Sequence, residues 1–154
     1  MAKMQNRQRL LDKMAKMPAA VRSAIKQALA QGADEITDEM RRLAPKDTGK
    51  LRDSITQTWG GGRQAYASLS AGGGALGDPD LTVRISAGNS GVRYAHLVEF
   101  GTAPHLNGGL FAGSLHPGTA PQAFFFPAYR ANRRRVKSRI SRATTRAVKA
   151  FAAS

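Results

Sequence analysis

The sequence contains no cysteine, few aromatic residues and no long apolar run, and each shortage excludes a class of protein. Without cysteine in its 154 residues, the chain has no disulfide, no thiolate metal site and no cysteine nucleophile. Aromatic residues make up 6% of the chain and hydrophobic residues 42%, so we expect a small, aliphatic, alanine-rich core. No apolar run is long enough for a signal peptide or for a span of about 18 residues, so we expect neither general secretion nor membrane insertion.

Acidic residues are scarce in the second half of the chain, where Glu99 is the only one after Asp80. The net charge is +14. Residues 1–51 hold 11 basic and 6 acidic groups, residues 52–127 hold 4 of each, and residues 128–154 hold 9 basic groups and no acidic group. The excess positive charge therefore lies at the two ends. It is compatible with phosphate binding, with an acidic protein partner and with a solvated helix face.

Hydrophobic periodicity predicts a long helix at each end of one domain over residues 18–154. The first covers residues 18–44, where apolar side chains recur at helical spacing between Pro18 and Pro45, with Gly32 weakening its middle. The second covers residues 126–152 and combines an apolar stripe with many arginines. Residues 1–17 are expected to be a flexible basic extension that becomes helical only when it docks.

Residues 54–100 are expected to form a small antiparallel sheet with a short helix. Alternation over residues 55–59 and 65–69, around Gly60, Gly61 and Gly62, predicts a β-hairpin, and residues 81–85 predict a third strand. Residues 71–80 are expected to be a loop and residues 94–100 a short helix. Residues 101–121, with five glycines and three prolines, are expected to be a long irregular loop with an intersubunit or tube-lining role. The predicted fold class is α+β, with a long N-terminal helix, a sheet of three to four strands with a short helix, and a long basic C-terminal helix.

The residue types needed for catalysis are mostly missing. His96, His105 and His116 invite a metal site, but Glu99 is the only acidic residue near them and no recognisable ligand spacing accompanies them. No G-x-S-x-G sequence occurs, and the acidic cluster at residues 34–39 is explained by a solvated helix face. We therefore expect no enzyme, no metal and no cofactor.

Three short segments, at residues 44–55, 94–102 and 121–128, fall at predicted junctions between elements. Their characteristic residues are, in order, Pro45, Asp47, Thr48, Gly49, Leu51, Tyr94, Glu99, Phe100, Gly101, Thr102, Pro121, Phe124 and Pro127. Pro45 ends a helix, Asp47 or Thr48 can accept hydrogen bonds from free backbone N–H groups, and Gly49 permits a tight reversal. Together the segments resemble the tail-completion or neck (head-tail joining) family of long-tailed double-stranded DNA bacteriophages, the minor tail protein Z-like proteins.

That resemblance implies a non-enzymatic structural virion protein, assembled in the host cytoplasm. Its subunits are expected to close into a ring, usually of six, that completes the tail tube and joins it to the neck, with tail termination as a closely related role. Expected partners are further copies, the tail tube or tail terminator protein, the head-tail connector or stopper protein, and genomic DNA passing through the lumen without sequence specificity. Within such a ring, Glu99 is expected to pair with an arginine of a neighbouring subunit or, alternatively, of its own chain.

The basic C-terminal helix leaves a second interpretation open. Its candidate contacts to DNA or to an acidic protein are Arg133, Arg134, Arg135, Lys137, Arg139, Arg142, Arg146 and Lys149. Phosphate contacts from such a helix give association that is blind to sequence, so a small DNA-binding protein is the alternative function. We favour an acidic protein partner slightly, because a lumen that grips phosphates strongly hinders DNA ejection.

Overall fold

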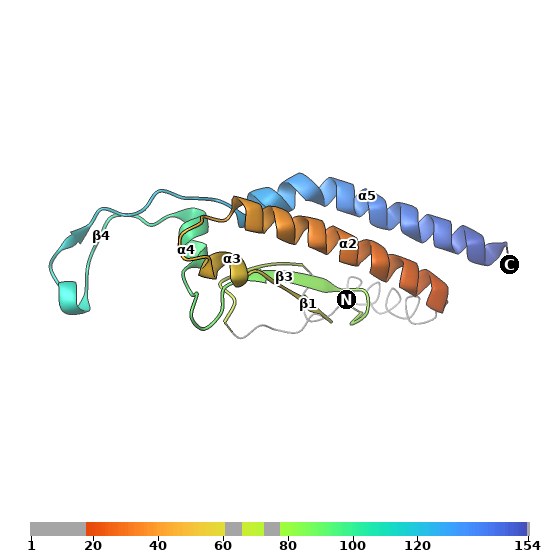
Figure 1. Ribbon diagram of the computed structural model, residues 1–154, viewed down its shortest axis with the longest axis horizontal. Coiled ribbons are helices and arrows are strands. Elements are labelled where there is room, and N and C mark those ends of the chain that lie inside the picture. The colour runs from red at the N-terminus through yellow and green to blue at the C-terminus, as the bar shows by residue number, and fades with distance from the viewer. Residues whose placement is uncertain (1–17, 61–65, 73–77, 154) are drawn as a thin grey trace, which may run out of the picture.

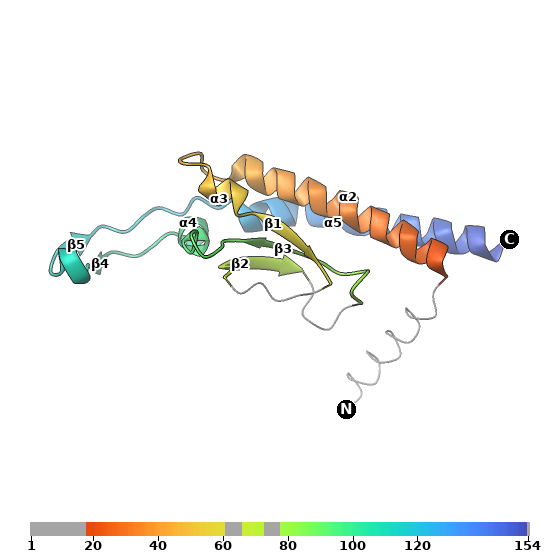
Figure 2. The ribbon, with the colours of Figure 1, turned by 60° about the horizontal axis from the view of Figure 1, so that its bottom comes forward.

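The computed structural model describes residues 18–60, 66–72 and 78–153, and its architecture is the predicted α+β fold. Helix α2 (Ala19–Leu43) packs on a small antiparallel sheet, and helix α5 (Phe125–Ala152) runs antiparallel beside α2 (Figure 1). The two helices continue past one end of the sheet (Figures 1 and 2). Residues 101–121 form a narrow projection at the other end of the molecule, which we call the arm. The extension expected over residues 1–17 lies outside the described residues.

The two long helices begin and end within one residue of their predicted bounds. Pro18, with φ −55° and ψ 144°, precedes α2, and Ala44 is extended before Pro45, as expected for a residue before proline. Val21, Ile25, Ile36 and Met40 bury the apolar stripe of α2. The local pattern of apolar residues and prolines was therefore sufficient to place both helices.

The sheet contains three strands in the order β1-β3-β2, so the predicted hairpin between the first two strands is wrong. β1 (Thr56–Trp59) and β2 (Leu69–Gly72) pair on opposite edges of β3 (Val83–Ala87), with Gln57 and Ala71 both opposite Ile85. β3 is the most buried strand, and the glycine-rich connection after β1 is long enough to cross to its far edge. β2 also includes the first residues of the predicted 71–80 loop, of which residues 73–77 lie outside the described residues.

Two short helices and an arm complete the fold. Helix α3 (Lys50–Asp53) follows α2, and α4 (Ala95–Phe100) follows β3 at the predicted place. The stretch 101–121, expected to be irregular, contains a second two-stranded antiparallel sheet of β4 (His105–Leu106) and β5 (Leu115–His116). A 3₁₀ turn, η1 (Gly109–Phe111), lies at its tip. Two-residue strands among glycines and prolines carry no alternating pattern, which is why the sequence did not indicate them.

The core is small and rich in alanine, as predicted, and lies between the sheet, α2 and the start of α5. Two fully buried aromatic residues from the start of α5 are added to it. Its buried members are Ala33, Ile36, Met40, Ala44, Leu51, Ile55, Leu69, Ile85, Ala87, Val92, Ala95, Phe124, Phe125 and Ala128.

Candidate assembly surfaces

Glu99, the last acidic residue of the chain, caps the N-terminus of α5. Its side chain comes from α4, is 3% exposed, and accepts hydrogen bonds from three consecutive backbone N–H groups. Oε2 accepts from Phe124 and Phe125, both at 2.8 Å, and Oε1 accepts from Phe126 at 3.0 Å. A carboxylate at this position also interacts favourably with the positive end of the helix dipole.

The cap accounts for every backbone group that the first turn of α5 leaves without a helical partner. A helix leaves its first four N–H positions unpaired. Glu99 takes those of Phe124, Phe125 and Phe126, and the fourth position is Pro127, which has no N–H. The expected pairing of Glu99 with an arginine, of a neighbour or of its own chain, is therefore wrong. The carboxylate is buried and binds backbone N–H groups, and these lie 25 to 27 residues further along the chain.

The second and third segments thus meet at the root of the arm. The Gln122 N–H donates to Val98 O at 2.8 Å, and Thr102 and Thr119 exchange two backbone hydrogen bonds at 3.0 and 3.1 Å. Gly101, at φ +71°, would place a Cβ 2.5 Å from Thr119 O, so a side chain at this position is excluded. Both strands of the arm are consequently held together where they leave the body.

The arm exposes large apolar side chains far from the core. Leu106 is 71% exposed, Leu110 99%, Phe111 73% and Leu115 69%, and all four lie around the β4–η1–β5 tip. Backbone hydrogen bonds across the arm, from Asn107 N–H to Ser114 O at 2.9 Å, hold the tip in shape. Large apolar side chains exposed together on a folded chain are typical of a protein interaction site.

The first segment is a folding element with an exposed turn. Leu51 is buried and Gly49 adopts φ +81°, as the predicted reversal requires. Asp47 and Thr48 are exposed and no side chain caps α3, so the predicted capping by either residue is wrong. The turn is instead fixed by arginines, because Arg41 Nη2 donates to Ile55 O at 2.9 Å and Arg52 Nε to Arg41 O at 3.0 Å.

A groove of about 390 Å³ brings the first two segments and the arm root together. Its lining includes Pro45 from the first segment and Leu97 and Val98 from α4, with Thr102 and Thr119 from the arm root. Tyr94 is 39% exposed and Phe100 63% exposed, so part of the second segment is also available at the surface. Gln122 from the third segment also lines the groove, so residues of all three segments meet where the arm leaves the body.

The basic helix divides into paired and exposed cations. Arg135 Nη2 lies 3.0 Å from Glu35 Oε2, and Arg139 Nη2 lies 2.5 Å from Glu35 Oε1, so these two residues tie α5 to α2. The hydrogen bond from Arg139, with the charges of Arg139 and Arg135, holds the pKa of Glu35 below its ordinary value. The other basic residues of α5 are all exposed, and they are Arg130, Arg133, Arg134, Lys137, Arg142, Arg146 and Lys149.

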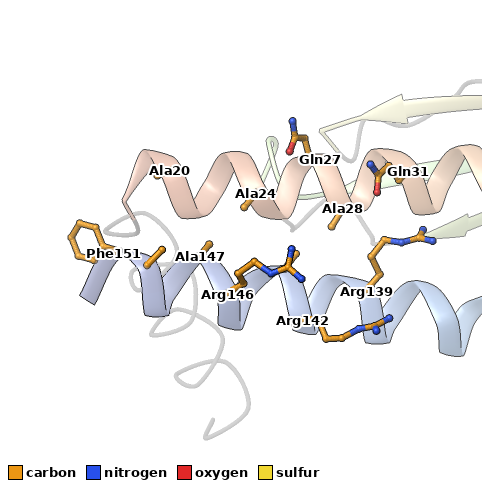
Figure 3. Close-up of a pocket in the computed structure, with 12 residues that line it drawn as sticks. Ala20, Ala24, Gln27, Ala28, Gln31, Arg139, Arg142, Arg146, Ala147 and Phe151 are labelled. Atoms are coloured by element: carbon orange, nitrogen blue, oxygen red, sulfur yellow. The ribbon is translucent and has the colours of Figure 1, made fainter. Parts of the chain in front are cut away.

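A second groove, of about 710 Å³, lies between the first half of α2 and the second half of α5 (Figure 3). We call it the alanine groove, because small side chains line both of its walls. α2 contributes Ala20, Ala24 and Ala28, and α5 contributes Ala143, Ala147 and Ala150. Arg139, Arg142, Arg146 and Phe151 also line it. These parts of α2 and α5 lie at the end of the molecule opposite the arm (Figure 1).

The histidines do not assemble a metal site in the described residues. His105 and His116 stack across β4 and β5 with ring centroids 5.0 Å apart, and each ring makes a local backbone hydrogen bond through Nδ1. Within residues 18–60, 66–72 and 78–153, no group of three or more potential ligands lies close enough to hold a metal ion. None of the helices in the same ranges has the length and apolar character that crossing a membrane requires.

Comparison with known protein families gives a match to the model described as "Bacteriophage HK97-gp10, putative tail-component", over residues 8–101. This chain belongs to the HK97-gp10-like family. The matched range contains the first segment and all of the second except Thr102, and it ends where the arm begins, so nearly all of the arm and all of α5 lie beyond it. As a member of the HK97-gp10-like family, the chain is a phage tail structural component and part of the virion. No curated protein and no solved structure matches it.

Proposed function

We propose that this HK97-gp10-like protein forms a ring, of six subunits, at the head-tail interface. The ring completes the tail tube, joins it to the neck and lets genomic DNA pass through its lumen, without catalysis. Its flanking partners are the tail tube or tail terminator protein on one side and the head-tail connector or stopper protein on the other.

The projecting arm is the observation that supports this proposal. It extends away from the body and exposes Leu106, Leu110, Phe111 and Leu115, a cost to solubility that an assembled state removes. A projection that docks on a different surface of the next copy makes a head-to-tail contact, and such contacts close into rings when the rotation fits. Assembly through the arm is therefore consistent with membership of a tail-component family and explains why the arm projects and exposes apolar side chains.

Assembly is tested by measuring the mass and symmetry of the full chain, alone and mixed with tail tubes, by mass photometry and negative-stain imaging. The proposal expects rings, or caps at one end of each tube. A protein that stays monomeric and ignores tubes at micromolar concentration contradicts it.

The alternative, a small DNA-binding protein, rests on the exposed cations of α5. Arg130, Arg133, Arg134 and Lys137 lie within two turns of one helix and are all exposed. Such contacts give an affinity that falls steeply with salt. This alternative is selected if the monomer retards duplex DNA in a gel and does not cap tubes, and if the retardation disappears when these four residues are replaced by glutamine. Retention of tube capping by the same variant favours the ring.

A further inference from the structure

The arm lies within the longest uncharged stretch of a strongly basic chain. Residues 101–129 contain no aspartate, glutamate, lysine or arginine, while the whole chain carries +14. Two copies of such a chain repel each other through this net charge. A contact between copies is least opposed where one side carries no charge, and the arm with its exposed Leu110 and Phe111 supplies such a side.

The alanine groove has the complementary form. Its walls include the methyl groups of Ala20, Ala24, Ala143 and Ala147. Figure 3 shows Ala20 and Ala24 on α2 and Ala147 on α5, with the side chain of Arg146 beside them. The groove is lined by alanines, whereas the tip of the narrow arm exposes leucine and phenylalanine side chains. Its arginines favour an occupant without positive charge, and the arm has none.

The positions of arm and groove make the contact intermolecular. The arm projects toward one end of the long axis, and the parts of α2 and α5 that line the groove lie near the opposite end, beside the C-terminus (Figure 1). The paired root at Thr102 and Thr119 holds the arm's two strands together as they leave the body. An arm at one end therefore reaches the groove of another copy, and the contact is head-to-tail.

We propose that the arm tip of one copy docks in the alanine groove of the next copy, with Leu110 and Phe111 between α2 and α5. This inference rests on the proposed ring and names the contact that closes it. Residues 1–17 are a competing occupant, since they precede α2 directly and contain apolar side chains. Their five basic residues and one acidic residue, however, would face Arg139, Arg142 and Arg146, so charge disfavours them.

The absence of native cysteine allows a direct test by cross-linking. Leu110→Cys and Ala147→Cys chains are mixed, alone and on tail tubes, and treated with a short bis-maleimide. We expect a covalent heterodimer in roughly a hundredfold excess over random collision, because docking holds the two thiols at high effective concentration. A chain with both substitutions is expected to give a ladder that ends at the ring's subunit number. Thr145→Cys is the matched control, because Thr145 is exposed on the same helix and does not line the groove.

The outcomes separate this contact from the proposed function. Rings or tube caps without the 110–147 cross-link overturn the docking inference and leave the ring intact. Absence of both rings and caps overturns the ring itself. An intrachain cross-link between Met14→Cys and Ala147→Cys shows that residues 1–17 occupy the groove, which also overturns the inference. A second cross-linking pair uses Leu110→Cys on one chain and Ala143→Cys on the other. Adding Ala147→Trp to the Ala143→Cys chain fills the groove and is expected to abolish the covalent heterodimer. Adding Thr145→Trp instead is expected to preserve it.

Discussion

Gly32 in α2 lies so close to Val136 in α5 that a Cβ at position 32 would overlap the valine side chain. A glycine expected only to weaken the helix therefore permits a close approach of the two long helices. Gly32→Ala gains about 1 kcal/mol of helix propensity and loses about 1–3 kcal/mol to overpacking, so we expect net destabilisation. Urea unfolding followed by circular dichroism measures it.

The second variant in this test is Val136→Ala, which removes the obstructing methyl groups. In a double-mutant cycle, Gly32→Ala and Val136→Ala are expected to couple favourably by about 1 kcal/mol or more, since each relieves the defect of the other. Strictly additive effects would show that the two residues do not limit the helix approach.

Glu99 is expected to be one of the most sensitive polar positions of the chain. Glu99→Gln keeps one acceptor oxygen but turns an amide N–H₂ toward backbone donors, leaving at least one buried N–H unpaired. We expect a loss of about 1–3 kcal/mol in the free energy of unfolding. Glu39→Gln, at an exposed ion pair with Arg42, is the control and is expected to change little. Equal stability of the two variants would contradict the capping role.

The Glu35 ion pairs predict acid sensitivity of the contact between α2 and α5. Arg139 and Arg135 hold the pKa of Glu35 below its ordinary value of 4.5, so the folded state binds this proton less tightly than the unfolded chain. The stabilisation is complete above pH 4.5 and is lost as the pH falls through the lower folded value. Thermal unfolding of Glu35→Gln from pH 7 to pH 3 is therefore expected to show a smaller acid-induced decrease in Tm. A decrease equal to that of the unmodified chain would refute this assignment.

The arm tip is expected to matter for assembly and not for folding. Leu110 and Phe111 are 99% and 73% exposed, so replacing both with serine removes little buried surface and should change stability by less than about 0.5 kcal/mol. The same variant is expected to lose ring or cap formation in mass photometry. Val148→Ser, exposed on α5 outside the arm and the alanine groove, is the control and should assemble normally. Normal assembly of the arm variant would exclude the tip from the interface.

The elements that the sequence predicted well are those determined by local residues. The bounds of α2 and α5 follow from prolines and a 3.6-residue apolar period, both of which act within a few residues. Strand pairing is different, because β2 lies beside β3 only through contacts that depend on the whole core. Gly60 and its neighbours indicated a turn but contained no information about which edge the next strand joins.

The candidate site was only partly predictable for the same reason. The three segments identified the family, and Glu99, Gly101 and Thr102 do lie together at the arm root. The cap on α5 was missed because its donors are 25 to 27 residues from Glu99. Leu110 and Phe111 were treated as part of a loop, because no periodic pattern distinguishes an exposed interface from an irregular segment. The one available signal was the absence of charge from residue 101 to residue 129 in a basic chain.

The buried cap also fixes the root of the arm to the first turn of α5. α4 precedes the arm and α5 follows it, and the Glu99 carboxylate on α4 binds the backbone N–H groups at the start of α5. α5 continues for 28 residues, a length of about 42 Å at the standard helical rise. The Glu35 ion pairs tie α5 to α2 further along the helix, so the arm root is connected to the pair of long helices and not to α5 alone. In a head-to-tail assembly, the angle between the arm and this helix pair would set the rotation from one subunit to the next, and therefore whether the ring closes.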